Sequence, residues 1–146
     1  MAAAYGNWRG GRVKEAFETL KAIMRKHAGH MIVTTDTPKL YYVDAGYSET
    51  WKKDVFFGSV RFGKSYVSYH LIPVYACPEL LEALSPELRK RMQGKSCFNF
   101  KTVSADQARE LDLLTRKSVQ RFKRVARLRP GNPGAGSARS RGPGST

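Results

Sequence analysis

Residues 55–75 read VFFGSVRFGKSYVSYHLIPVY, and this stretch decides the fold. Apolar and polar side chains alternate on both sides of Gly63-Lys64, and aromatic and β-branched residues dominate, which is typical of two paired strands. A glycine in the first place of a two-residue connection favours a type II′ turn. The pattern therefore predicts a β-hairpin with strands at 55–62 and 65–75.

Two longer segments predict helices that pack against this hairpin. In residues 12–28, apolar side chains recur at spacings of three and four residues, and charged side chains occupy the opposite positions. Residues 105–128 repeat the pattern after a capping box that runs from Ser104 to Gln107. The remaining signals are strands at 31–35 and 40–44, a loop at 45–53, a helical region from 79 to 94 that Ser85-Pro86 divides, and a strand at 97–101.

These elements follow one another in the order α-β-β-β-β-α-β-α. Because short loops join most of the strands, the sheet should be mostly antiparallel, with the helices packed on one face. The predicted class is therefore a small α+β fold. Residues 12–128 would form a single domain, between a flexible leader at 1–11 and a disordered tail of Gly, Pro, Ser and Arg at 129–146.

The positive charge of the chain is unevenly distributed. The 146 residues carry a net charge of +14, but residues 1–115 hold 17 basic and 12 acidic residues, whereas residues 116–146 hold nine basic residues and no acidic one. The two cysteines are too few for a disulfide-stabilised fold, and no secretory signal is visible. No apolar stretch approaches the roughly 20 residues that cross a bilayer. We expect a cytoplasmic protein with free thiols.

Four stretches of the chain read VKEAFETLKAIMRKHA, DTP, FFGSVRFGKSYVSYHLIPVY and SPELRKRMQGKSCFNF. Together with the last amphipathic helix, they resemble the YdhG-like domain family across about residues 12–125. That family is a set of small bacterial proteins classed mainly as a domain of unknown function. The resemblance implies a curved antiparallel sheet with flanking helices and brings no catalytic motif with it. Some relatives are described as frataxin-like intracellular iron chaperones.

Alternation along the predicted strands divides their side chains between two faces. If the aliphatic side meets the helices, the other side is open and combines aromatic rings with cationic and hydrogen-bonding groups. Such a face suits a small ligand, single-stranded nucleic acid or a second sheet, although antiparallel sheets also carry Tyr, Ser and Thr where they simply face water. The residues of this open face are Phe57, Ser59, Arg61, Tyr66, Ser68, His70, Asn99 and Lys101.

Two other features suggest anion binding. The stretch QGKS at 93–96 resembles the end of a phosphate loop, but it lacks the upstream glycine and precedes a strand, so Lys95 and Ser96 indicate only a weak anion site. The basic last helix and tail predict weak, sequence-independent nucleic-acid contact, although cations favour any helix C-terminus. The residues concerned are Arg121, Lys123, Arg124, Arg127 and Arg129.

Metal and catalytic chemistry receive little support. The histidines and cysteines lack the spacing of a zinc site. Iron prefers carboxylate ligands, and an iron carrier usually has an acidic surface on its first helix, whereas here Glu15 and Glu18 share that helix with five basic residues. Ser68 and His70 share a strand face, but no nucleophile elbow is present. We predict no catalytic residue, no metal ligand and no cofactor.

The sequence therefore predicts a non-enzymatic binding domain of YdhG-like type. It would act through the open sheet face on an unidentified small ligand or protein partner, as a monomer or homodimer without membrane contact. Frataxin-like iron binding is one alternative. Weak nucleic-acid binding by the C-terminal helix and tail is another.

Overall fold

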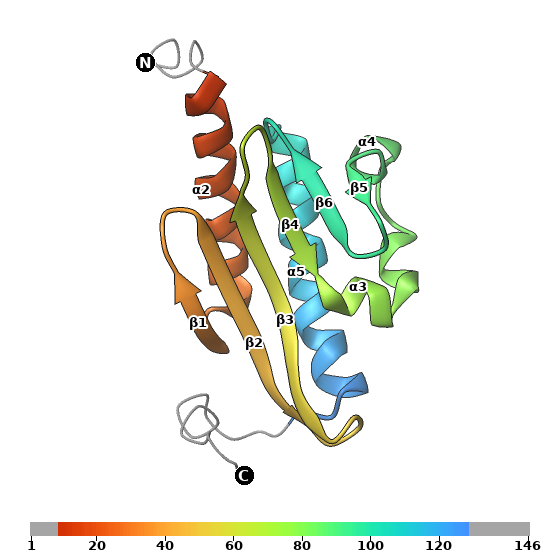
Figure 1. Cartoon of the computed structure of the whole chain (residues 1–146). Coiled ribbons are helices and arrows are strands. Elements are labelled where there is room, and N and C mark those ends of the chain that lie inside the picture. The colour runs from red at the N-terminus through yellow and green to blue at the C-terminus, as the bar shows by residue number, and fades with distance from the viewer. Residues whose placement is uncertain (1–8, 129–146) are drawn as a thin grey trace.

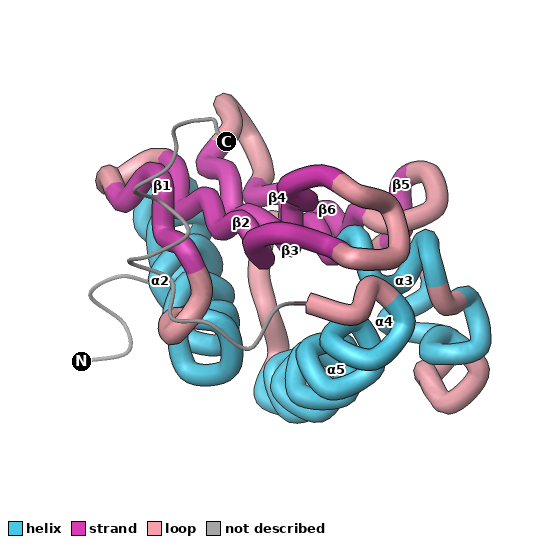
Figure 2. Tube along the Cα trace, turned by 90° about the horizontal axis from the view of Figure 1, so that it is seen from below, coloured by secondary structure: helices cyan, strands magenta, loops and turns pink. Residues whose placement is uncertain are grey.

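The computed structural model describes residues 9–128. Two long helices, α2 (Arg9–Ala28) and α5 (Ala105–Val125), lie side by side against one face of a six-stranded sheet (Figure 1 and Figure 2). The spatial order of the strands is β1-β2-β3-β4-β6-β5, and every neighbouring pair is antiparallel. The predicted α+β class, with an antiparallel sheet and helices on one face, is confirmed. The strands are β1 (Ile32–Asp36), β2 (Leu40–Ser48), β3 (Lys53–Phe62), β4 (Val67–Leu71), β5 (Met92–Gln93) and β6 (Cys97–Phe100).

Three short helices connect β4 to β5. They are α3 (Ile72–Ala76), the 3-10 helix η1 (Pro78–Leu81) and α4 (Pro86–Arg89). The predicted cap is present, because the Ser85 hydroxyl accepts a hydrogen bond from the Leu88 amide at 3.2 Å. Helical structure begins at Ile72, so the expected strand at 65–75 is wrong beyond Leu71, and it ends at Arg89 instead of Gly94. The strand β5, which was not predicted, follows it.

Two of the hairpin connections, those between β2 and β3 and between β3 and β4, differ from the predicted ones. The expected loop at 45–53 is wrong, because β2 continues to Ser48 and β3 begins at Lys53. The predicted two-residue turn is also wrong: Phe62 pairs with Val67, and residues 63–66 form a four-residue connection. Phe62 and Val67 both pack toward the helices, so burial of the two side chains sets this register.

The core lies between the two long helices and the inner face of the sheet. Burying one large apolar side chain stabilises the fold by about 1.5–3 kcal/mol, and the core contains many of them. The Tyr69 hydroxyl of β4 lies in this core, 2.6 Å from the Thr115 hydroxyl of α5. The principal buried side chains are Phe17, Leu20, Met24, Phe57, Val60, Val67, Tyr69, Leu71, Phe98, Phe100, Leu111 and Phe122.

A β-bulge in β3 changes which side chains reach this core. Val43 of β2 pairs with Gly58, and the next residue, Asp44, pairs with Phe56. Phe57 therefore has no partner on β2. One extra residue in a strand reverses the facing of the chain beyond it, because side chains alternate with a period of two.

The prediction that Phe57 lies on the open face is consequently wrong. Phe57 is fully buried, and its ring centroid lies 6.1 Å from that of Phe122 in α5. Phe56 takes the outward position instead. A second extra residue, Ala45, lies on β2 and restores the register of the two strands, so that Gly46 pairs with Val55. Gly46 has a φ of +106°, which glycine adopts readily.

Candidate functional site

The sheet face away from the helices carries the candidate site (Figure 2). Ser59 of β3 lies between Tyr42 of β2 and His70 of β4, because it pairs with both. Ser59 is only 8% exposed although its side chain is short, so larger neighbours shield it. The Phe56 ring lies 4.6 Å from that of Tyr42 and 5.1 Å from that of His70, measured between centroids. We call these four residues the ring patch.

A row of polar side chains adjoins the ring patch. Arg61 follows Ser59 on the same face of β3, and its side chain is exposed. It pairs with Ser68, which in turn pairs with Asn99. The Ser68 hydroxyl donates to Oδ1 of Asn99 at 2.7 Å, so these two groups are held in place. An exposed cation therefore lies two residues along β3 from Ser59, on the face that carries the rings.

A carboxylate marks the opposite end of the ring patch. Asp44 pairs with Phe56 and is half-buried. Burial raises the pKa of Asp44, and the nearby charge of Asp54 raises it further. The two ends thus have opposite charge, which directs an anionic group on a bound molecule toward Arg61 and away from Asp44.

His70 is fixed and uncharged near neutral pH. Its Nε2 lies 2.8 Å from the Ser96 hydroxyl, and the Ser96 carbonyl accepts a hydrogen bond from the Leu71 amide at 2.9 Å. Burial lowers the pKa of His70 below its ordinary value of 6.5. The imidazole therefore serves the patch as a neutral ring.

The pKa of His70 leads to a prediction about pH. The pKa of His30 is also lowered, first by burial and then by the charge of Lys123. Near pH 6, both histidines therefore bind protons more readily in the unfolded chain than in the folded protein. We expect the free energy of unfolding to fall between about pH 7 and about pH 5, with no single histidine contributing more than about 1.4 kcal/mol per pH unit. His70→Gln, which keeps a hydrogen-bonding group near Ser96, should make this slope shallower in urea titrations. An equal slope in the variant would contradict the assignment.

Cys97 lies on the same face, paired with His70. Burial raises the pKa of the Cys97 thiol, although hydrogen bonds from Ser68 and from the Phe98 backbone act in the opposite direction. A thiol with a raised pKa stays protonated near neutral pH and is a poor nucleophile. His70 contacts Ser96 through Nε2, so that nitrogen is already occupied.

The structure brings together part of the predicted open face. Arg61, Ser68, His70 and Asn99 lie on neighbouring strands on the predicted side, together with Ser59. Tyr66 and Lys101 are exposed but lie outside the strands, in the β3–β4 connection and just after β6. The residues that sequence reasoning missed are Tyr42, Asp44 and Phe56. A glycine inside β3, at position 58, was a signal for the bulge that turns Phe56 to this face.

The two predicted anion features lie in different places. Lys95 is exposed in the turn before β6, whereas the Ser96 hydroxyl contacts His70 and so belongs to the margin of the ring patch. Arg121, Lys123 and Arg124 are on α5 and Arg127 just follows it, behind the sheet; Arg129 lies outside the described residues. The basic helix and the ring patch are therefore separate surfaces.

Within residues 12–128, no three His, Cys, Asp or Glu side chains come together in a way that could hold a metal ion. Glu15 and Glu18 are exposed on α2, one turn apart. Iron carriage stays a prediction of the family resemblance.

Comparisons with protein-family models, curated proteins and solved structures found no match to this chain. The resemblance to the YdhG-like family thus rests on the sequence stretches alone and stays a prediction. Among residues 9–128, no helix combines the length and the hydrophobicity that crossing a bilayer requires.

Proposed function

We propose that this protein is a small binding domain that holds a planar aromatic anion on the open face of its sheet. The observation that carries the proposal is the ring patch with Arg61 beside it. Tyr42, Phe56 and His70 offer ring surfaces around the small Ser59, and the exposed Arg61 follows Ser59 on the same face of β3. Aromatic surface with a few placed polar groups is what small-molecule sites typically present.

The chemistry of the patch defines how such a ligand would lie. Its ring would stack on the aromatic side chains, a contact worth about 1–3 kcal/mol per ring in single-strand-binding proteins. Its carboxylate or phosphate would pair with Arg61, whose planar guanidinium suits both groups. The charge of Asp44 disfavours the reversed orientation. The proposal assigns binding and no chemical step, because His70 is neutral and the Cys97 thiol is protonated near neutral pH.

The first test compares three probes: 1-naphthoate, the uncharged 1-naphthamide and the non-aromatic cyclohexanecarboxylate. We expect 1-naphthoate to bind tightest in calorimetric titrations, because only this probe uses both the rings and Arg61. Equal affinity for the amide would exclude the role of Arg61. Equal affinity for the cyclohexane acid would exclude the role of the rings.

The second test uses variants with matched controls. Arg61→Gln and Phe56→Ala should each weaken 1-naphthoate binding by about tenfold, since each removes an interaction of about 1.4 kcal/mol or more. Lys90→Gln and Tyr75→Ala remove an exposed cation and an exposed ring near the other helices, and should leave binding unchanged. Equal losses in the test and control variants would overturn the proposal.

A further inference from the structure

A second surface, separate from the ring patch, lies on the outer side of α5. Between residues 116 and 127, the chain buries Ser118, Val119, Phe122 and Ala126 against the core. Apart from Gln120 and the half-buried Val125, every other residue in that interval is arginine or lysine, and none is acidic. These six cations are Arg116, Lys117, Arg121, Lys123, Arg124 and Arg127.

Little of this charge is neutralised by the described part of the protein. Arg121 forms an ion pair with Glu79 of η1. Across residues 12–128, none of the other five cations has an ion pair with an acidic side chain. A solvated helix end needs one or two cations in its last turn to balance the helix dipole. Six cations over three turns exceed that need.

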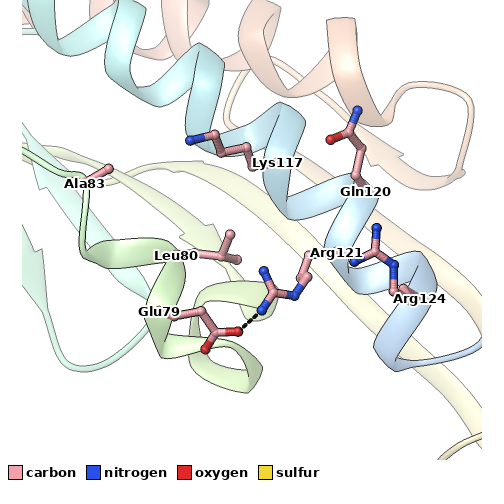
Figure 3. Close-up of a pocket in the computed structure, with 7 residues that line it drawn as sticks. All are labelled: Glu79, Leu80, Ala83, Lys117, Gln120, Arg121 and Arg124. Atoms are coloured by element: carbon pink, nitrogen blue, oxygen red, sulfur yellow. Dashed lines mark hydrogen bonds and ion pairs between the residues drawn. The ribbon is translucent and has the colours of Figure 1, made fainter.

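A groove runs along one side of this helix. It has a volume of about 310 Å³ and lies between η1 and α5 (Figure 3). Figure 3 shows Arg121 reaching across it to Glu79, so this guanidinium is positioned by a partner from the opposite wall. Lys117 and Arg124 line the groove about one turn before and after Arg121. Seven residues of helix cover about 10.5 Å, the length of about three base-pair steps in a duplex.

The partial negative charge at the C-terminal end of α5 is reduced by hydrogen bonds. The last carbonyl groups of a helix carry partial negative charge, but here the β2–β3 turn occupies them. The Ser48 hydroxyl donates to the Ala126 carbonyl at 2.6 Å, and the Thr50 hydroxyl donates to the Val125 carbonyl at 2.7 Å. The same turn brings one charge of each sign to this end of α5, because it holds both Glu49, whose amide donates to the Arg127 carbonyl at 3.1 Å, and the exposed Lys52.

We propose that the outer face of α5 binds the phosphate backbone of nucleic acid without sequence preference. Regularly spaced guanidinium and ammonium groups match a backbone that carries a charge at every step. Insertion into an anionic membrane is disfavoured, because the large apolar residues of α5 are buried in the core apart from the exposed Leu113 and the half-buried Val125. An acidic protein partner is disfavoured because residues 116–127 expose no aromatic or large aliphatic anchor beyond the half-buried Val125, and the β2–β3 turn adds only the single exposed ring of Trp51.

The test measures how binding depends on salt. The full chain is titrated against fluorescently labelled duplexes of two unrelated sequences, and anisotropy is recorded from about 50 to about 200 mM KCl. Lys117→Gln/Arg124→Gln is compared with Lys14→Gln/Lys90→Gln, which removes two exposed cations from other elements. Thermal unfolding of each variant checks that the fold is retained.

We expect both duplexes to bind equally. Each lost phosphate contact lowers the slope of log affinity against log salt by about 0.9, so the α5 variant should lose about 1.8 and the control variant nothing. The fall in affinity over this salt range should then shrink by about tenfold. Equal slopes in the two variants would overturn the proposal. So would equal or tighter binding to phosphatidylserine vesicles or to polyglutamate than to the duplexes.

Discussion

Phe57→Ala is expected to lower the free energy of unfolding by about 3–5 kcal/mol, whereas Phe56→Ala, one residue earlier, should cost only about 1 kcal/mol. The difference follows from the bulge, which turns Phe57 into the core against Phe122 and leaves Phe56 half-buried on the open face. Deleting a fully buried ring removes its transfer free energy and leaves a cavity. Deleting a ring at the surface leaves no enclosed space.

Urea denaturation of the two variants measures this difference. The pair is a matched control in itself, since the same ring is removed from neighbouring positions of one strand. If regular alternation held through β3, the order of the two costs would be reversed. Equal costs would also contradict the described bulge.

Gly58→Ala is expected to destabilise the protein by about 3 kcal/mol, at the upper end of what one extra methyl group costs in a packed region. A Cβ at this position would lie 2.5 Å from the carbonyl oxygen of His70 and 2.9 Å from Cε of Met24. Met24 can change its rotamer, but the backbone of β4 cannot move without lengthening the hydrogen bonds between β3 and β4.

Ser59→Ala is the control, because it changes the next residue on the opposite face and alters no backbone contact. It should change the free energy of unfolding by less than about 1 kcal/mol. Gly58→Ala should also broaden or shift the NMR signals of Leu71 and His70, since the two strands must separate locally. A Gly58→Ala protein as stable as the parent would show that α2 and β4 do not approach β3 as closely as described.

Much of the fold follows from local patterns in the sequence. The two long helices were predicted from their apolar spacing and caps, although α2 begins at Arg9, inside the leader expected at 1–11, and α5 ends at Val125. The predicted capping box is present: the Ser104 hydroxyl accepts from the Gln107 amide, and the Gln107 side chain accepts from the Ser104 amide. These signals work because they depend on residues three or four positions apart. The pairing of strands depends instead on residues that are far apart in the sequence.

The errors occur where tertiary packing overrides local preference. Gly63-Lys64 has the composition of a two-residue turn, but pairing of Phe62 with Val67 produces a longer connection. The face assigned to Phe57 required an unbroken alternation that the bulge interrupts. Gly58 marks a place where the alternation can break, but the bulge is stabilised by burial of Phe57 against Phe122 of α5, and no local pattern specifies that distant contact.

Part of the candidate site was predictable because local alternation shows which residues of a strand share a face. Ser59, Arg61, Ser68, His70 and Asn99 lie on stretches of strand that the bulge does not interrupt, so their common face could be inferred from alternation. The contact between His70 and Ser96, by contrast, depends on the path that α3, η1, α4 and β5 take before the chain returns as β6. That path is a property of the whole fold.

The most direct test of the proposed binding surface is an NMR titration of the isotope-labelled protein with 1-naphthoate. We expect saturable shifts of the Tyr42, Phe56, Ser59, Arg61 and His70 signals, and contacts between naphthyl protons and the Phe56 ring. Saturable shifts in the groove between η1 and α5 instead, or none at millimolar probe, would contradict the account.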